Sequence, residues 1–569
     1  MSRRERSEMS PLEARVRAWM ADDPDDTDRA ELARLLQDGS PAAAAELADR
    51  FAVRLCFGTA GLRGALGAGP NRMNRAVVRA ASAALAGWLD RHAAGSRAAG
   101  VAVGCDARFG SLEFAAEAAR VLTGAGFRVH LLPPRQPTPL LAFAVRHLRA
   151  AAGVMITASH NPPGDNGYKV YLGDGAQIAP PADAEIEAAI ETLGPLSDIP
   201  VADPDGPLAI HHDRQLVEAY LEAVAARSPA PPGAGGLRIV YTPLHGVAGS
   251  LFVAALERAG FPAPHVVAAQ AEPDPLFPTV ALPNPEEPGA LDLALGEARR
   301  IGADIVVAND PDGDRLAVAV PDPSQQGGWR ILTGDQIGCL LGTFELERSK
   351  SDPEPQERLL VTTIVSSTML SGIAAANGVR YVETLTGFKW IARAGDRFPG
   401  CRLVLGYEEA LGYCVGDVVR DKDGIGAALA LLGLAVTARR DGSSLIEAWD
   451  ALEEIHGVHL TAQLSIGHES PAAVMARLRA FPPRHLGGLE VTEALDLAGG
   501  SDTLPAADVL VYKMPGARLV VRPSGTEPKL KAYLEVTEEV TAGGLDASRR
   551  RAGGRLVRLR SAATGALGV

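Results

Sequence analysis

One short stretch holds the residues best suited to covalent chemistry. Residues 153–171 read GVMITASHNPPGDNGYKVY. The apolar run 153–156 predicts a buried strand, which places Ser159 and His160 on the loop that follows it. Open α/β sheets bind ligands at such strand ends. Ser159 could therefore be a phosphate ligand or a nucleophile, although Ser, Asn, Pro and Gly are also ordinary turn residues and by themselves favour a turn.

Three aspartates follow a second apolar strand. The run IGADIVVAND leads into Asp310, Asp312 and Asp314. Carboxylates at alternate positions can face one hard cation, and they repel one another unless something positive neutralises them. An EF-hand loop also begins D-x-D-x-D, but it needs glycine at position six and glutamate at position twelve, where this chain has Arg315 and Pro321. A solvated acidic turn remains the alternative to a metal site, and Mg²⁺ is the expected ion if a phosphate shares it.

Two glycine-containing loops carry arginine among groups that bind anions. The stretch FGTAGLRG places three glycines around Arg63, so that backbone N–H groups and a guanidinium can approach one anion. Near the other end, RPSGTEPKLK lies between two predicted strands and begins at Arg522. Its arginine, two hydroxyls and glycine predict a phosphate cradle. A loop that needs positive φ and a tight hairpin are the respective alternatives.

Two further loops carry groups that suit a phosphorylated sugar. Glu408 and Glu409 in GYEEALGY could accept hydrogen bonds from sugar hydroxyls, or they could form a charged turn or a helix N-terminus. The chain has only seven lysines, and five of them, Lys169, Lys389, Lys422, Lys529 and Lys531, lie in loops flanked by glycine or proline. A compact ammonium suits a phosphate that must move or reorient. Chance is the competing explanation of this placement.

Composition limits the classes of function. The net charge of −13 argues against nucleic acid or an anionic membrane as the main partner. No apolar run approaches the length of a transmembrane span, and the first residues contain no apolar signal segment. Five cysteines without a CxxC pair fit a reducing compartment. We therefore expect a cytoplasmic protein that acts on small molecules.

Alternating strands and helices must position these loops. Residues 1–50 show helical spacing of apolar residues, and from residue 75 onward strand and helix alternate, which predicts parallel sheets. Residues 195–236 and 321–328 have the composition of boundaries, and the pattern changes near Asp441. The Gly/Ala/Arg-rich tail from Thr541 could form a helix, but its end is expected to fray.

The motifs TASHNPPGDNGYKVY, DPDGDR, GYEEALGY and RPSGTEPKLKAY occur here in that order. Together they resemble the α-D-phosphohexomutase superfamily, the phosphoglucomutase/phosphomannomutase enzymes, from Phe57 to about Glu535. FGTAGLRG, TLTGFK and GYEEALGY look most like the branch of phosphopentomutases and glucose-1,6-bisphosphate synthases. The resemblance implies an α/β fold, with three similar α/β domains with mixed sheets and a smaller C-terminal α+β domain around a central cleft. We expect these domains at 1–205, 206–322, 323–440 and 441–569.

The resemblance also implies a role for each matched residue. Ser159 would be the phosphoserine, and its oxygen would hold Mg²⁺ together with Asp310, Asp312 and Asp314. The residues expected to neutralise charge or move protons at the transferring group are Arg63, His160, Lys169 and Arg315. Those expected to bind substrate are Thr386, Gly387, Lys389 and Glu408 at the sugar, and Arg522, Ser524, Gly525 and Thr526 at the non-reacting phosphate.

The resemblance implies a phosphosugar mutase that works through a phosphoserine and a bisphosphorylated sugar, with a sugar 1,6-bisphosphate as activator. Related hexomutases carry serine where this chain has Ala410. We expect glucose phosphate first, mannose phosphate next, and then ribose or deoxyribose phosphate, in a monomer or weak dimer. A Mg²⁺-dependent phosphatase would not need the cradle at Arg522, and a non-catalytic sugar-phosphate binder would not need the aspartate triad beside a serine.

Overall fold

The computed structural model describes residues 10–58, 61–351, 357–468, 470–524 and 529–568. The chain forms two compact units. The first contains Met1–Arg227, Arg238–Leu316 and Val418–Ile425, and the second contains Ser228–Leu237, Ala317–Asp417 and Gly426–Val569. The short stretch Val418–Ile425 therefore belongs to the first unit, although its neighbours on both sides along the chain belong to the second.

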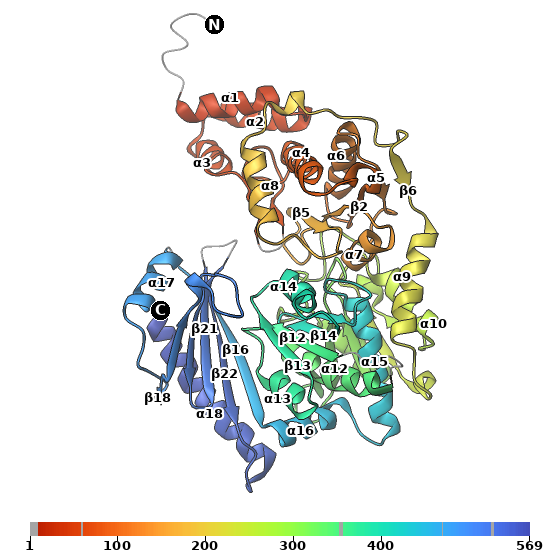
Figure 1. Ribbon diagram of the computed structural model, residues 1–569, viewed down its shortest axis with the longest axis vertical. Helices are drawn as coiled ribbons and strands as arrows, with labels where there is room; N and C mark the ends of the chain where they lie inside the picture. Colours follow the sequence, from red (N-terminus) through yellow and green to blue (C-terminus); the bar gives the residue numbers. More distant parts are fainter. Residues whose placement is uncertain (1–9, 59–60, 352–356, 469, 525–528, 569) are drawn as a thin grey trace, which may run out of the picture. The chain divides into compact units, whose positions relative to one another are not determined.

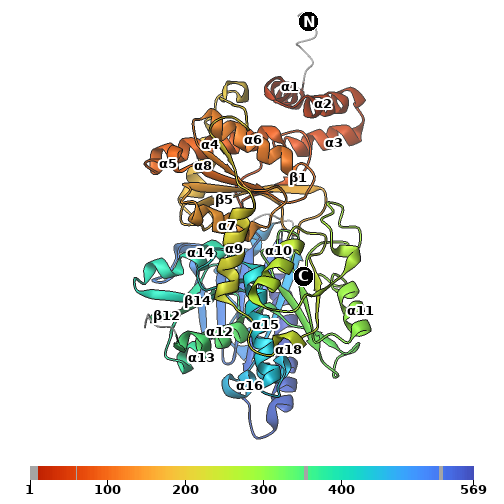
Figure 2. The ribbon, with the colours of Figure 1, turned by 90° about the vertical axis from the view of Figure 1, so that its right-hand side faces the viewer.

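Three helices open the first unit, as the spacing of apolar residues predicts. They are α1 (Pro11–Asp22), α2 (Asp26–Asp38) and α3 (Pro41–Arg50). Each begins after a residue whose side chain accepts a hydrogen bond from a backbone N–H of the first turn, namely Ser10, Asp25 and Ser40. Figure 2 shows the three helices grouped together. The helical prediction is confirmed over the described part of residues 1–50.

A six-stranded mixed sheet follows in the first unit. Its order is β1 (Leu62–Ala65), β5 (Asp165–Leu172), β4 (Ala152–Ile156), β2 (Val101–Cys105), β3 (Val129–Leu131) and β6 (Ala209–His211). The strands β4, β2, β3 and β6 are parallel, whereas β5 pairs antiparallel with both β4 and β1. Figures 1 and 2 place α4 (Arg75–His92), α6 (Ser111–Gly124) and α8 (Ala182–Glu191) on one face of this sheet, and α7 (Thr138–His147) on the other. The remaining helices of this part are α5 (Ser96–Ala99) and α9 (Arg214–Arg227).

A second parallel set of strands completes the first unit. The strand β7 (Ile239–Thr242) pairs with both β8 (His265–Val266) and β9 (Ile305–Ala308). The helices here are α10 (Gly249–Ala259) and α11 (Asp292–Ile301). All four residues of β9 are buried. The strand therefore ends at Ala308, directly before the buried residues Asn309 and Asp310.

The second unit contains another mixed sheet. Its order is β13 (Arg380–Thr384), β12 (Glu357–Thr363), β14 (Cys401–Glu408) and β15 (Gly412–Val415), and only the β14–β15 pair is antiparallel. A hairpin of β10 (Ala317–Pro321) and β11 (Trp329–Ile331) precedes it. The helices along this part of the chain are α12 (Gly334–Arg348), α13 (Met369–Ala376), α14 (Phe388–Arg393), α15 (Gly424–Arg440) and α16 (Leu445–His456).

The C-terminal part of the second unit is α+β. Its antiparallel sheet has the order β16 (Val458–Gly467), β22 (Lys529–Glu538), β21 (Ala517–Pro523), β20 (Leu510–Met514) and β19 (Glu493–Asp496). A small hairpin of β17 (His485–Leu486) and β18 (Leu489–Glu490) accompanies it, with the helices α17 (Pro471–Ala480) and α18 (Gly544–Leu567). The predicted fold class, α/β parts with mixed sheets followed by an α+β part, is confirmed.

The C-terminal tail forms the helix that the sequence allowed, but its end is better packed than predicted. α18 continues to Leu567 and lies along the sheet (Figure 1). The side chains of Ala552, Leu559, Ala563 and Leu567 are buried in a core shared with β16 and β22. These residues recur at helical spacing and form an apolar stripe, which the high glycine and arginine content conceals. Among the described helices, none combines the length and the apolar character needed to cross a membrane.

Candidate active site

Ser159 lies just beyond the end of β4, as predicted, in an unusual backbone conformation. Its φ of 53° is left-handed, which is uncommon for a residue with a side chain. The N–H of Ser159 donates to Thr157 Oγ1 over 2.9 Å, and this contact fixes the turn. Its hydroxyl donates to Asp310 Oδ2 over 2.6 Å and lies 3.1 Å from His160 Nδ1. The loop therefore presents Ser159 Oγ directly to the aspartate loop.

The side chain of Arg108 donates hydrogen bonds to the backbone of the serine loop. Its Nη1 donates to the carbonyl oxygens of Pro162 and Asp165 over 2.8 and 3.1 Å. Its Nη2 donates to those of Ser159 and Asn161 over 2.7 and 2.6 Å. The side chain is buried, and its guanidinium lies 5.0 Å from the ring centroid of Phe277. One side chain thus satisfies four inward-facing carbonyl groups around the candidate nucleophile.

Asp106 completes this support from the end of the neighbouring strand β2. It accepts hydrogen bonds from Thr157 Oγ1 over 2.6 Å and from Ser111 Oγ over 2.7 Å. Neither Asp106 nor Arg108 was predicted from the sequence as a site residue. The available signal was their place in VAVGCDAR, immediately after a buried strand, which is the position that Ser159 and the aspartates occupy after theirs.

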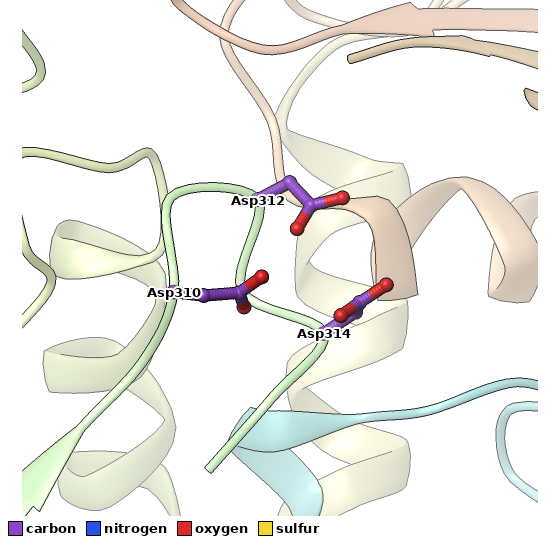
Figure 3. Close-up of side chains that lie close together, drawn as sticks. All are labelled: Asp310, Asp312 and Asp314. Atoms are coloured by element: carbon purple, nitrogen blue, oxygen red, sulfur yellow. The ribbon is translucent and has the colours of Figure 1, made fainter. Parts of the chain in front are cut away.

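The three aspartates come together as predicted. Figure 3 shows the side chains of Asp310, Asp312 and Asp314 directed toward one region from a single loop after β9. All three are buried, and one oxygen from each lies within 4.8 Å of the others. Asp310 Oδ1 accepts the backbone N–H of Arg315 over 3.0 Å, which closes the loop on itself.

Two lysines form ion pairs with the aspartate triad, and a threonine donates a hydrogen bond to it. Lys169 Nζ lies 2.6 Å from Asp312 Oδ2 and 3.1 Å from Asp314 Oδ2. Lys422 Nζ lies 3.2 Å from Asp314 Oδ2, and Thr138 Oγ1 donates to Asp312 Oδ2 over 2.6 Å. Burial and Asp312 act to raise the pKa of Asp314, but Lys169, Lys422 and Arg315 bring it below its ordinary value. These cations therefore favour the charged form of Asp314.

The donor set fits a hard divalent cation. Asp312 Oδ1 and Asp314 Oδ1 are buried, and neither has a hydrogen-bond partner among the described residues. A buried carboxylate oxygen without a partner is costly, so two of them beside a third carboxylate indicate a missing ligand. Carboxylate and hydroxyl oxygens are the donors that Mg²⁺ accepts. The triad thus has the chemistry of a metal-binding site.

The other predicted catalytic residues lie in the same unit. Arg63 is on β1 and its Nη1 donates to Asn161 Oδ1 over 3.3 Å. Burial lowers the pKa of His160 well below its ordinary value, and the nearby Arg315 and Arg63 lower it further. Arg315 Nη1 lies 3.2 Å from Glu286. The structure thus places Arg63, His160, Lys169 and Arg315 around Ser159 and the aspartates.

The predicted sugar-reading loops meet inside the second unit. The backbone N–H of Gly387 donates to Glu408 Oε1 over 2.8 Å, so the two loops are joined there. Thr386 precedes that contact, and Lys389 is buried in the first turn of α14. Burial, followed by Glu408 and Asp335, raises the pKa of Glu409 to about 7. Its Oε2 accepts from the hydroxyls of Thr363 and Ser366 over 3.3 Å each.

The predicted phosphate cradle is described only in part. Arg522 lies near the end of β21, and its Nη2 donates to the hydroxyl of Tyr533 over 3.1 Å. The N–H of Ser524 donates to the carbonyl of Lys529, the first residue of β22, over 2.8 Å. Gly525 and Thr526 lie outside the described residues.

Lys422 and Thr138 were not selected as site residues from the sequence. Lys422 had attracted attention as one of few lysines, but nothing local tied it to the aspartates, which lie more than 100 positions earlier. Thr138 opens α7, and its N–H also donates to the carbonyl of Asp312 over 2.9 Å. Both residues reach the metal loop only through the tertiary fold.

Comparison with known proteins matches most of this chain to one family. Four of its domain profiles match: phosphoglucomutase/phosphomannomutase alpha/beta/alpha domain I at residues 54–195, domain II at 218–326, domain III at 333–452 and the C-terminal domain at 476–552. A Haemophilus influenzae protein named "Probable phosphomannomutase" is 41% identical over 473 residues, which cover 81% of this chain and 93% of that protein. The phosphopentomutase of Homo sapiens is 34% identical over 565 residues, covering 92% and 91%.

A solved structure supports the fold independently. The crystal structure of a phosphoglucomutase/phosphomannomutase family protein from Burkholderia thailandensis aligns with a TM-score of 0.68. The alignment covers 90% of this chain and 97% of that chain at 20% identity. At that identity the similarity concerns the fold.

Proposed function

The chain belongs to the phosphoglucomutase/phosphomannomutase family and is a phosphosugar mutase, and we propose that Ser159 carries the phosphoryl group that it transfers. The group would move between the C1 oxygen and the C6 or C5 oxygen of a sugar phosphate. The observation that carries this proposal is the 2.6 Å hydrogen bond from Ser159 Oγ to Asp310 within the aspartate triad. A serine hydroxyl is brought there to a cation site, with Lys169 and Lys422 beside it.

The reaction balances as two phosphoryl transfers. In the first, the bond from phosphorus to Ser159 Oγ breaks and a bond to the oxygen of the free sugar hydroxyl forms; that hydroxyl loses a proton and Ser159 Oγ takes one up. The product is a sugar bisphosphate. In the second, the bond from the other phosphoryl group to the sugar oxygen breaks and a bond to Ser159 Oγ forms; Ser159 Oγ loses its proton and the sugar oxygen takes one up. Such transfers depend mostly on positioning and on stabilising the spread negative charge.

The residues of the first unit divide these tasks. Asp310, Asp312, Asp314 and a phosphoserine oxygen at Ser159 would hold Mg²⁺. When bound, this ion stabilises negative charge on the phosphoryl oxygens. Lys169, Arg63 and Arg315 offset the remaining charge, and His160, 3.1 Å from Ser159 Oγ, can hold or pass the hydroxyl proton. Lys422 joins this group through Asp314.

The second unit would recognise the substrate. Thr386, Gly387, Lys389 and Glu408 would contact sugar hydroxyls, and Arg522, Ser524, Gly525 and Thr526 would hold the phosphate that is not reacting. A sugar 1,6-bisphosphate would serve as activator. Glucose phosphate is the first substrate that we propose, with mannose phosphate next.

Pentose phosphates form the second candidate class of substrate, together with glucose-1,6-bisphosphate synthesis. Ala410 has no hydroxyl where related hexomutases carry serine, so one hydrogen bond to a hexose is missing or replaced. The similarity to the phosphopentomutase of Homo sapiens over 92% of this chain favours the same class.

A coupled assay with Mg²⁺ and catalytic glucose 1,6-bisphosphate tests the proposal. Glucose 1-phosphate, mannose 1-phosphate and ribose 1-phosphate are compared for conversion to their isomers. We expect Ser159→Ala to abolish transfer and Asp312→Asn to lose Mg²⁺-dependent activity. Asp90→Asn, in an exposed ion pair with Arg97, is the matched control and should behave as the wild type.

The outcomes separate the candidates. Turnover of ribose 1-phosphate without hexose turnover would retain the phosphoserine chemistry and assign the enzyme to pentose phosphates. Full activity of Ser159→Ala would refute the role of Ser159. Release of inorganic phosphate without isomerisation would contradict a mutase reaction.

A further inference from the structure

Arg63 lies on β1, a short strand at the edge of its sheet. β1 has four residues and lies at the edge of its sheet, where it pairs only with β5. Short edge strands are held by few hydrogen bonds. A catalytic side chain nevertheless has to be fixed within a fraction of an ångström. Besides β5 and the core in which Leu62 is buried, a further part of the molecule contacts this strand and can fix its position.

The loop after β1 is inserted into the three N-terminal helices. Ala68 is fully buried, and its methyl group belongs to the small apolar core formed by Val16, Leu32, Leu47 and Phe51. This core is distinct from the core that packs against the six-stranded sheet, although Trp19 contacts both. Ala68 thus takes its packing from α1, α2 and α3, whereas Leu66 and Met73 at the ends of the loop pack with the core of the sheet.

Two charged side chains form hydrogen bonds with the backbone N–H and carbonyl of Ala68. Glu31 Oε2, from α2, accepts the N–H of Ala68 over 3.1 Å. Arg50 Nη1, from α3, donates to the carbonyl of Ala68 over 3.1 Å. Arg50 Nη2 also donates to Glu31 Oε1 over 2.7 Å, and its Nε donates to Glu46 over 2.7 Å. The buried Arg50 therefore joins the helices and the loop in one closed network.

The loop is shaped for this close approach. Gly67 and Gly69 have φ values of 144° and 110°, which favour glycine. A Cβ at either position would lie 3.3 Å from the Arg50 side chain. Asn74 holds the same loop from the other side, because its Nδ2 donates to the carbonyls of Gly67 and Gly69 over 2.9 and 2.8 Å.

The network continues back to β1. The N–H of Met73 donates to the carbonyl of Ala65, the last residue of β1, over 2.8 Å. The N–H of Leu55, just after α3, donates to the carbonyl of Pro70 over 3.0 Å, and its side chain covers Gly64 within β1. Movement of the helices would therefore move the strand that carries Arg63.

We propose that α1–α3 act as a positioning element for catalysis, in which Arg50 and Glu31 fix β1 so that Arg63 faces the transferring phosphoryl group. These helices precede residue 54, where the matched family domain begins. The inference rests on the proposed role of Arg63. Arg50 is a positioning residue, because it contacts Ala68 and not the reacting groups.

A double-mutant cycle in the full-length enzyme with Mg²⁺ tests the proposal. The variants are Arg50→Ala, Arg63→Ala and the combination, with kcat and KM measured for each. Because small misplacements of catalytic groups can cost up to about 100-fold in rate, we expect Arg50→Ala to lower kcat by about tenfold with KM nearly unchanged. In the Arg63→Ala background the same change should alter kcat by less than about twofold, since residues that act through one another are not additive.

Controls keep the result interpretable. Arg17→Ala removes an exposed arginine of α1 that pairs with Glu13, and it should leave kcat unchanged. If Arg50→Ala does not fold, the cycle is repeated with Arg50→Lys, which keeps the charge but cannot bridge both Glu31 and Ala68.

An equal loss of kcat in both backgrounds would overturn the inference, because Arg50 would then act on something other than Arg63. An unchanged kcat in Arg50→Ala, with Arg63→Ala impaired, would overturn the inference and leave the proposed function standing. Full activity of Arg63→Ala would refute the role of Arg63 and the inference with it.

Discussion

We predict that Arg108→Ala leaves the first unit folded but makes Ser159 much less reactive. The substitution leaves every residue that would contact substrate in place. It removes the donors to four carbonyl groups of the serine loop, which lie 2.6–3.1 Å from the guanidinium nitrogens. It also leaves the buried Asp106 without the guanidinium 3.5 Å away.

The magnitude follows from these contacts. A hydrogen bond from a charged group contributes about 1.5–3 kcal/mol, so four would contribute about 6–12 kcal/mol if nothing replaced them. Water that enters the vacated space restores much of this, so we expect a net loss of about 3 kcal/mol. Ser159 also holds a left-handed φ, which costs about 1–3 kcal/mol and favours relaxation of the loop. A 3 kcal/mol bias away from the reactive loop lowers kcat by about 100-fold.

The assay measures kcat and KM for the sugar 1-phosphate with the highest turnover, together with thermal unfolding. Arg108→Lys is the graded comparison, because one ammonium keeps a charge beside Asp106 but cannot reach four carbonyls, and it should lose about tenfold in kcat. Arg97→Ala removes an exposed arginine and serves as the control. A folded Arg108→Ala enzyme with kcat within about threefold of the wild type would refute the reasoning, since the loop would then hold Ser159 without its clamp.

Three further predictions concern other parts of the molecule. Lys169→Met leaves Asp312 and Asp314 without the ammonium group that they share. We therefore expect a loss of about 3–5 kcal/mol in stability, measured by denaturant unfolding, and a large loss of kcat in the coupled assay. Unchanged stability would contradict this prediction. Gly246→Ala would place a Cβ 2.3 Å from the Cα of Pro311, so the aspartate loop must shift. We therefore expect the Mg²⁺ concentration that gives half-maximal activity to rise. An unaltered Mg²⁺ titration would show that the loop tolerates the methyl group. The pKa of the Glu409 carboxyl is raised from 4.5 to about 7, so this group keeps its proton in the folded state at pH values where the unfolded chain has lost it. The stability of the protein should therefore fall as pH rises between these two values, and the stability of Glu409→Gln, measured by thermal unfolding, should not show that fall. Parallel pH profiles of the two proteins would disprove this prediction.

Much of the candidate site was predictable because its motifs are local. Ser159, the aspartates and Arg522 each sit where an apolar strand meets a loop, and strand ends can be recognised from a few neighbouring residues. The start of α3 is also encoded locally, because the cap Ser40 and the first helical residue Pro41 adjoin in the sequence. The end of α18 was missed because its apolar residues are widely spaced among glycine and arginine.

The sequence by itself determined which residues have side chains suited to phosphate, metal and sugar, and that strands and helices alternate around them, because these properties depend on side-chain chemistry and short-range periodicity. Only the tertiary structure decided that Arg108 clamps the loop of Ser159, that Lys422 reaches Asp314, and that Arg50 holds the loop after Arg63. The partners in the first two contacts lie 51 or more positions apart in the chain. Their proximity comes from how the strands pair and the helices pack, and no local pattern of residues records that.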